Sequence, residues 1–317
     1  MIRYLLVRLL WMVPVLFGAS IVMFLTVKLI PGDPALAILG PLATEEGLRR
    51  IREELGLNLP LYQQYFTWLI RMVQGDFGIS VTTHVPVAQL VWPKYWNTLI
   101  LATGSLVFAV VTGIVVGIIS GTRQYSVPDR FGMTMTLLLA NTPPFWLGLV
   151  LVLIFSLNLH WLPAAGMYDI RASGKDFVDL LKHLILPAIA TGASPAAIIA
   201  RLVRSSLLDV IRQDYITAVR AKGMSEKVVI FKHALRNSLP PIINIIALQI
   251  GFLLGGALFS EVVFSWPGIG QQLYTSINSR DFPVIQAAVL LATATFVIIN
   301  TLTDVVNMIL DPKIRRA

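Results

Sequence analysis

The sequence contains no cysteine and few charged residues, with Asp, Glu, Lys and Arg making up only 13% of its 317 positions. The absence of cysteine excludes disulfides, thiol catalysis and Cys-ligated metal or iron–sulfur sites. A soluble protein of this length would carry about a quarter charged residues. Because 56% of the residues are hydrophobic, and several apolar runs are long enough to cross lipid, the sequence predicts a membrane protein.

Motifs for nucleotide binding and hydrolysis are also missing. The sequence has no G-x-x-x-x-G-K-[ST] phosphate loop, no H-E-x-x-H and no G-x-S-x-G. The histidines are scattered over separate segments, at His84, His160, His183 and His233. We therefore expect no catalytic residue, no metal site and no cofactor in this chain.

The apolar runs are continuous rather than alternating, which predicts an all-α integral membrane protein, since only helices and closed barrels span lipid. Six transmembrane helices are predicted, at about 5–30, 98–121, 131–157, 184–203, 240–260 and 284–308. Pro143 and Pro144 predict a kink in the third helix, and Pro187 and Pro195 lie within the fourth. The first run is too long for the core of a cleaved signal peptide, so we interpret it as a retained first span.

Three parts are predicted along the chain. Residues 1–30 form an N-terminal tail and the first span, residues 31–96 a polar region outside the membrane, and residues 97–317 a core with five spans. The polar region is expected to contain short amphipathic helices, one of which starts at Thr44 and ends at Gly56. No internal repeat or soluble domain is visible.

Basic residues are distributed unequally between the predicted loops. If the N-terminus is cytoplasmic, the inner segments carry fifteen Lys and Arg and the outer segments nine. The positive-inside rule then places both termini in the cytoplasm. This distribution explains the net charge of +8 without a nucleic-acid partner.

The connection at 204–239 is the longest basic segment. Ile216, Val219 and Met224 recur at helical spacing among basic residues, and Gly223 predicts a bend between two short helices. Composition leaves two interpretations open. The connection could lie among lipid headgroups, or it could dock against a cytoplasmic protein.

This connection resembles the E-A-A-x-x-x-G segment of ABC-importer permeases, with Ala218 and Gly223 at the matching spacing. Thr217 stands at the glutamate position, Val219 at the second alanine position, and Leu235-Arg236 where the broad motif has Leu-Pro. Further segments resemble the permeases of dipeptide, oligopeptide, nickel and glutathione importers: 214–216, 220–223, 233–237, 30–34, 75–78, 261–270 and 311–315. The long first outer loop is similar to that of the B-type permease.

The resemblance implies a type I importer permease with the MetI-like fold, acting as one permease subunit of an ATP-driven importer for di- or oligopeptides. Implied partners are a homologous second permease, two ATPases that bind ATP and Mg, an extracytoplasmic solute-binding protein and membrane lipid. The implied location is the cytoplasmic membrane of a bacterium or archaeon. A nickel or glutathione permease of the same family remains an alternative. A secondary transporter is less favoured, because no inverted repeat is visible.

The resemblance also implies a coupling helix at about 215–232 that seats in an ATPase groove. The residues expected to couple are Tyr215, Ala218, Arg220, Ala221, Lys222, Gly223, His233 and Arg236. Burial of Ala218, Val219 and Met224 is expected to supply the contact, and the basic side chains to orient it.

Polar residues in or near the last two spans are candidates for the pathway or its gate: Asn244, Gln249, Glu261, Trp266 and Asp304. Polar groups at such depth commonly line a pathway or a bundle interior. The alternative is structural, with hydrogen bonds between helices or, for Trp266, anchoring at the lipid interface. Gly251, Gly255 and Gly256 are expected to allow close helix contact, either as simple packing or as a sliding interface between two permease halves.

Overall fold

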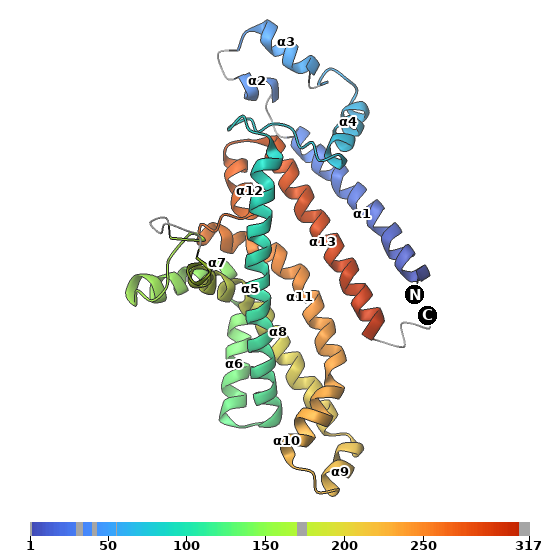
Figure 1. Cartoon of the computed structure of the whole chain (residues 1–317), viewed down its shortest axis with the longest axis vertical. Helices are drawn as coiled ribbons and strands as arrows, with labels where there is room; N and C mark the ends of the chain where they lie inside the picture. The colour runs from blue at the N-terminus through green and yellow to red at the C-terminus, as the bar shows by residue number, and fades with distance from the viewer. Residues whose placement is uncertain (1, 30–33, 40–42, 55, 170–175, 311–317) are drawn as a thin grey trace. The chain divides into compact units, whose positions relative to one another are not determined.

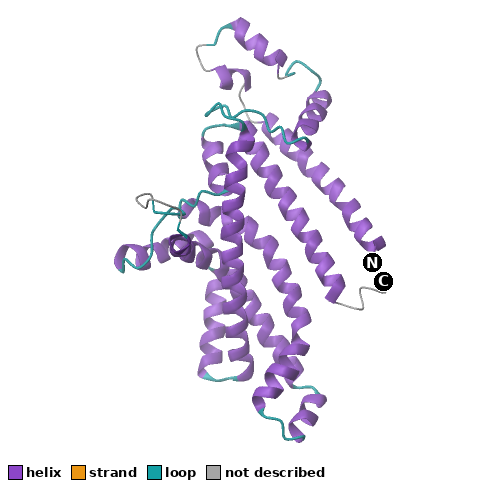
Figure 2. Ribbon diagram, in the orientation of Figure 1, coloured by secondary structure: helices purple, strands orange, loops and turns teal. Residues whose placement is uncertain are grey.

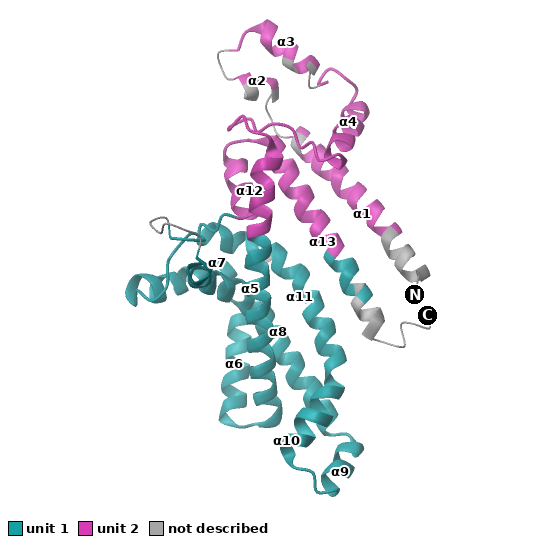
Figure 3. Ribbon diagram, viewed as in Figure 1, with its two compact units in different colours: residues 1, 98–267, 299–317 teal, residues 2–97, 268–298 magenta. Residues whose placement is uncertain are grey.

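The computed structural model describes residues 2–29, 34–39, 43–54, 56–169 and 176–310, which form helices joined by turns and loops (Figures 1 and 2). Residues 30–33 and 311–315, which carry two of the family motifs, lie outside the described residues. The chain divides into two compact units (Figure 3). One unit comprises residues 2–97 and 268–298, and the other comprises residues 98–267 and the chain from 299 onward.

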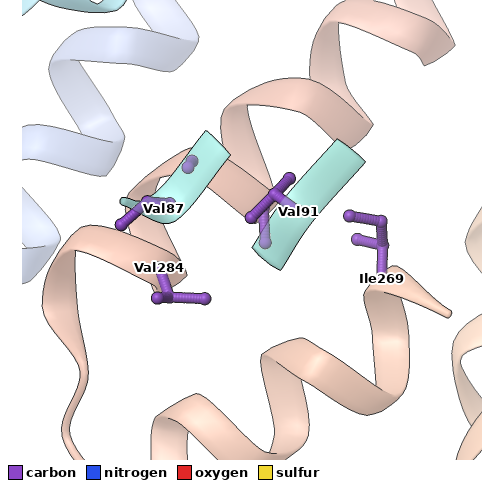
Figure 4. Close-up of a cluster of buried hydrophobic side chains, with 6 residues drawn as sticks. Val87, Val91, Ile269 and Val284 are labelled. Atoms are coloured by element: carbon purple, nitrogen blue, oxygen red, sulfur yellow. The ribbon is translucent and has the colours of Figure 1, made fainter. Parts of the chain in front are cut away.

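The unit formed by residues 2–97 and 268–298 combines one long N-terminal helix with short helices and the first parts of two other long helices. Its elements are α1 (Ile2–Leu29), α2 (Pro34–Leu39), α3 (Glu45–Glu54), α4 (Leu61–Val73), the start of α5 (Val87–Thr122), α12 (Ile269–Asn278) and the start of α13 (Phe282–Leu310). Val87 and Val91 of α5 pack with Ile269 of α12 and Val284 of α13 in one buried cluster (Figure 4).

The amphipathic helices predicted in the polar region are present, and α3 has the predicted ends. Gly47 N donates to Thr44 Oγ1 at 3.2 Å, which caps the helix. Gly56 follows with φ +64°, the left-handed conformation that commonly ends a helix. Later in the same unit, the buried carboxylate of Asp281 accepts hydrogen bonds from Ser80, from Val81 N at 3.2 Å and from Thr82 Oγ1 at 2.8 Å. This tie fixes the loop before α5.

The other unit contains further long helices. Its elements are the rest of α5, α6 (Val127–Asn141), α7 (Pro144–Leu151), the π-helix η1 (Val152–Asn158), α8 (Phe177–Ile211), α9 (Asp214–Ala221), α10 (Glu226–Val228), the π-helix η2 (Val229–Ala234), α11 (Leu235–Val263) and the end of α13. Within this unit, α9 and α10 join the ends of α8 and α11 (Figure 1).

The predicted membrane spans are confirmed as apolar helices, but the predicted number of six is not confirmed. Among the described residues, four helices are long and apolar enough to cross a membrane: Val87–Thr122, Phe177–Ile211, Glu226–Gly255 and Phe282–Thr303. The pair formed by Val127–Asn141 and Pro144–Asn158 makes a fifth if both halves belong to one span. In α1, the apolar stretch found is the shorter Leu10–Thr26.

The kink expected in the third span is a break. The two halves meet at 111° around Pro143 and Pro144. Proline lacks the N–H that a continuing helix needs, and it disfavours helical conformation in the residue before it. Two consecutive prolines therefore end α6 and allow α7 to leave in a new direction.

Helices α5 and α8 pack with their backbones in close approach. An added Cβ at Gly113 would lie 2.9 Å from Ala196 O, and one at Gly117 would lie 2.7 Å from Ala200 O. Small residues at such spacing allow membrane helices to approach closely. At Gly255 of α11 an added Cβ would meet no described atom within 4 Å, so the close helix contact expected at Gly251, Gly255 and Gly256 stays a prediction.

Candidate functional site

The connecting segment, defined here as residues 214–234, consists of two short helices on either side of a tight turn. The turn is formed at Gly223, whose φ is +76°, a conformation that side-chain-bearing residues rarely adopt. Gly223 N donates to Arg220 O at 2.9 Å, which closes α9. The bend predicted at this glycine is thus confirmed.

One side of the connecting segment packs against the protein's own long helices. Ile216 of α9 is fully buried in a cluster with Leu207 and Val210 of α8 and Val229 and Ala234 of η2. Burying one isoleucine side chain contributes about 1.5–3 kcal/mol. The cluster therefore attaches α9 to the helix that precedes it and to the helix that follows.

Tyr215 makes a second attachment on this side. Its hydroxyl accepts a hydrogen bond from Asn237 Nδ2 at 2.6 Å and donates to His233 O at 3.4 Å. These bonds join α9 to η2 and to the start of α11. His233 Nε2 is buried without a hydrogen-bond partner among the described residues. Tyr215 therefore holds the connecting segment in place from within, through Asn237 and the backbone carbonyl of His233.

Arg220 and Glu226 form a bidentate pair across the turn at Gly223. Arg220 Nη2 lies 2.6 Å from Glu226 Oε1, and Arg220 Nε lies 3.2 Å from Glu226 Oε2. The hydrogen bond that Arg220 donates to the Glu226 carboxylate raises the pKa of the guanidinium. The pair joins the two helices on either side of the turn, an interaction that the sequence analysis missed because it considered Arg220 only as a basic residue for a partner.

The opposite side of the connecting segment is exposed. Met224 is 42% exposed, and six residues of the predicted coupling set are also exposed: Ala218, Arg220, Ala221, Lys222 and Gly223 in the connecting segment, and Arg236 at the start of α11. Val219 is the exception among the expected contact residues, because it packs inward against the Ile216 cluster. The exposed face thus combines small, apolar and basic side chains around the turn.

The segment Glu261–Trp266 lies at the C-terminal end of α11. Its charged and aromatic side chains are buried, whereas the connecting segment has an exposed face. Glu261 and Trp266 are 0% exposed and Phe264 is 1% exposed. The carboxylate of Glu261 accepts a hydrogen bond from Thr98 Oγ1 at 2.6 Å, which ties α11 to α5. Ser265 turns the chain with φ +47°, so that the two aromatic residues beside it both point inward.

Neighbouring bonds extend this packing. Trp266 packs with Leu101 and Ala257, and Trp266 N donates to the carbonyl of Glu261 at 2.8 Å. Phe264 O accepts from Gly166 N at 2.8 Å, which secures the loop after η1. Trp266 therefore lies inside this unit, away from the surface position that an interface anchor requires.

The remaining pathway candidates lie on two different helices. Asn244 and Gln249 belong to α11, and the side-chain oxygens of both are buried with no hydrogen-bond partner among the described residues. Asp304 belongs to α13, but its side chain is outside the described part. Across the described residues, no group of three or more His, Asp and Glu side chains is arranged to hold a metal ion.

Sequence reasoning missed one partly buried ion pair. Arg204 of α8 donates to Asp129 of α6 at 2.7 Å from Nε and 2.8 Å from Nη2. Asp129 also accepts from Tyr125 N at 2.8 Å, so it holds the turn between α5 and α6. No spacing rule pairs residues this far apart in the chain.

The long apolar helices, with an exposed and internally braced connection between two of them, define an integral membrane protein. The fold matches a chain of the MetNI methionine ABC transporter in inward-facing conformation, native crystal form, with a TM-score of 0.54 at 19% identity, covering 70% of this chain and 97% of that chain. A second crystal form of MetNI matches with the same TM-score at 20% identity, covering 68% and 94%. These likenesses show the MetI-like fold.

The family follows from the sequence matches. Residues 113–316 match the family described as the inner membrane component of binding-protein-dependent transport systems, and residues 1–102 match its N-terminal component. The chain belongs to this family and is a membrane permease. It is 42% identical to the dipeptide transport system permease protein DppB of Alkalihalophilus pseudofirmus, over 99% of this chain and 100% of that one. It is equally 42% identical to the glutathione transport system permease protein GsiC of Escherichia coli strain K12, over 99% of both chains.

Proposed function

We propose that this permease forms half of the translocation pathway of an ATP-driven importer for di- and oligopeptides. The observation that carries the proposal is the connecting segment. It is attached on one side by Ile216 and Tyr215 and exposed on the other around Gly223. A segment attached in this way transmits a push or pull from a bound partner to α8 and α11.

The proposed partner on the exposed side is an ATPase that binds ATP and Mg, with two such subunits in the assembly. A homologous second permease would complete the pathway, and an extracytoplasmic solute-binding protein would deliver the cargo. The basic residues of the connecting segment support a cytoplasmic position for it and for both termini. The exposed set Ala218, Lys222 and Met224 would make the contact with the ATPase, while Arg220 serves mainly to brace the turn.

Co-purification and reconstitution test this function. The chain is expressed with the ATPases, the second permease and the binding protein encoded beside it, and the assembly is reconstituted in proteoliposomes containing ATP. The proposal expects stoichiometric ATPase subunits and ATP-dependent uptake of labelled dipeptide that requires the binding protein. Uptake driven by an ion gradient without ATPases would instead identify a secondary transporter.

A glutathione importer is the second candidate, because the identity to GsiC equals the identity to DppB. The two cargoes are separated by competition in the same proteoliposomes. Under the first proposal labelled dipeptide is taken up, excess unlabelled dipeptide abolishes that uptake, and labelled glutathione is not taken up. Glutathione uptake that continues in the presence of excess unlabelled dipeptide would favour a glutathione importer.

A further inference from the structure

A groove runs between α5, α6 and α8, and all residues that line it belong to the unit that contains residues 98–267. Its volume is about 380 Å³. Aromatic, aliphatic and small side chains form most of its wall: Phe108, Val116, Ile119, Pro128, Phe131, Gly132, Met135, Leu139, Ala196, Ala197 and Ala200. Neither the proposed ATPase contact nor the pathway candidates use any of these residues.

The few polar residues of the groove are placed unevenly. Thr112 donates its hydroxyl to Phe108 O at 2.6 Å and Thr136 donates to Met133 O at 2.8 Å, so both bond to their own helices. Ser120 is the exception, since its hydroxyl is buried without a partner among the described residues. The groove is therefore apolar over most of its length, with one unsatisfied hydroxyl near the end of α5.

The length of the groove matches one leaflet of a bilayer. Phe108 and Ser120 are separated by twelve residues of continuous helix, which corresponds to about 18 Å. The hydrocarbon core of a bilayer is about 30 Å thick, so one leaflet accounts for about 15 Å. A single acyl chain would thus extend along the groove from Ser120 to Phe108.

A basic side chain lies at the Ser120 end. Arg123 N donates to Ile119 O at 3.2 Å, which continues the last turn of α5 and places Arg123 on the groove side, one turn beyond Ile119. Arg123 is exposed. Arg204 lies one turn beyond Ala200 on α8, but its charge is compensated by Asp129.

We propose that this groove binds a phospholipid with an anionic headgroup. One acyl chain lies between α5, α6 and α8, and the phosphate lies against Arg123. The ester carbonyls lie about one helical turn deeper, at the depth of the Ser120 hydroxyl. Basic residues beside clefts between transmembrane helices commonly select anionic lipids in this way.

The chemistry of the groove favours a lipid over a helix of a second permease. A helix packed here would cover the groove along its whole length and would gain nothing from a cation at one end. An anionic phospholipid explains three features together: the apolar wall, the leaflet-like length, and the exposed cation of Arg123 at the end that carries Ser120.

The lipid is detected with a fluorophore placed in the groove. The chain has no cysteine, so Met135→Cys introduces its only thiol, at a groove position that is 37% exposed. The full assembly is labelled and placed in nanodiscs, with unsubstituted assembly as the control for partner thiols. Fluorescence quenching by acyl-brominated phosphatidylglycerol is compared with quenching by brominated phosphatidylcholine. We expect the anionic lipid to be preferred about fivefold, the factor corresponding to one basic residue at a headgroup.

Two matched pairs of variants decide the assignment. Arg123→Gln should remove the preference, whereas Arg130→Gln should keep it, because Arg130 lies about 200° around α6 from the groove residue Pro128. Val116→Trp should fill the groove and abolish quenching by both lipids, whereas Val115→Trp, at an exposed neighbouring position, should not.

Three results would overturn the proposal. Equal quenching by the two lipids in the assembly with Arg123 intact would show that the headgroup is not selected. An equal loss of preference with Arg123→Gln and Arg130→Gln would reduce the effect to general surface charge. No quenching by either lipid would show that another protein covers the groove in the assembly.

Discussion

The connecting segment and the Glu261–Trp266 segment lie at opposite ends of α11, and both carry family motifs, but their surroundings differ. In the connecting segment, Ala218, Lys222 and Met224 are exposed. At the other end, Glu261 and Trp266 are fully buried within the same unit. The side chains of the connecting segment are available to another protein, whereas those of the Glu261–Trp266 segment make contacts within the chain.

This difference separates two ways in which a motif can matter. Substitutions in the Glu261–Trp266 segment should lower the free energy of unfolding, because they remove packing or leave polar groups unpaired. Substitutions on the exposed face of the connecting segment should leave stability nearly unchanged and alter coupling to a partner. Comparing unfolding with transport in the same variants therefore tests the distinction directly.

The largest effect on stability is expected for Trp266→Ala. Trp266 is fully buried against Leu101 and Ala257, and truncating a buried tryptophan typically costs about 3–5 kcal/mol. Thermal unfolding of the purified assembly in detergent measures the loss. Trp161→Ala is the control, because Trp161 is 68% exposed and should cost far less. Equal unfolding temperatures for the two variants would contradict the buried position of Trp266.

A smaller loss is expected for Gly117→Ala. The added Cβ would lie 2.7 Å from Ala200 O and 2.5 Å from Val203 Cβ, so α5 and α8 would have to separate. Overpacking of this kind typically costs about 1–3 kcal/mol. Gly255→Ala is the matched control on α11, where an added Cβ meets nothing within 4 Å. If both variants unfold at the same temperature, close packing of α5 on α8 does not stabilise the unit.

Some of these features could be predicted from residues close together in the sequence. The bend at Gly223, the cap at Thr44 and the break at Pro143–Pro144 follow from local backbone chemistry, and the structure has all three. The 111° angle at the break could not be predicted, because it depends on the helices that α7 packs against.

Features that depend on pairing across the fold were missed. Nothing local links Asp129 to Arg204, or Glu261 to Thr98. The close packing of α5 is different, because Gly113-x-x-x-Gly117-x-x-x-Gly121 is visible in the sequence and is a recognised signal for helix contact. The burial of Trp266 was missed for another reason, since a tryptophan near a span end fits an interface anchor equally well.

Substitution of Gly223 should impair coupling and leave stability nearly unchanged, which is the opposite of the effect expected for Trp266. Gly223→Val forces a β-branched residue toward φ +76°, at a local cost of about 1–3 kcal/mol that the turn can relieve by changing conformation. We expect normal membrane insertion and little change in global unfolding, but ATP hydrolysis that no longer drives uptake. Reconstituted ATPase and dipeptide-uptake rates measure the coupling.

Gly223→Asn is the matched control, because asparagine tolerates this conformation better than other side chains. Coupling retained in Gly223→Asn and lost in Gly223→Val would show that the bend itself is required. Loss of coupling in both variants would show that the partner needs a position without a side chain at Gly223, because an added Cβ meets nothing within this chain. Normal uptake in Gly223→Val would contradict a role for the turn in coupling.

The smallest effect is expected for the pair formed by Arg220 and Glu226. Both side chains are partly exposed, at 41% and 57%, and exposed pairs contribute about 0.2–1 kcal/mol. Arg220→Gln or Glu226→Gln should therefore lower uptake modestly, and raised salt should narrow the difference from the unsubstituted protein because it screens the pair. Uptake at low and high ionic strength measures both effects.

Exchanging the two charges separates bracing from docking. If Arg220 acts by holding α9 to α10, the double variant Arg220→Glu with Glu226→Arg restores the pair across Gly223 and recovers most of the uptake lost in the single variants. If Arg220 instead contacts an acidic groove of the ATPase, the exchange places a carboxylate against that groove, and uptake falls below either single variant. The first outcome would place Arg220 with Tyr215 and Ile216 among the residues that hold the connecting segment, and would leave Ala218, Lys222 and Met224 as its contact face.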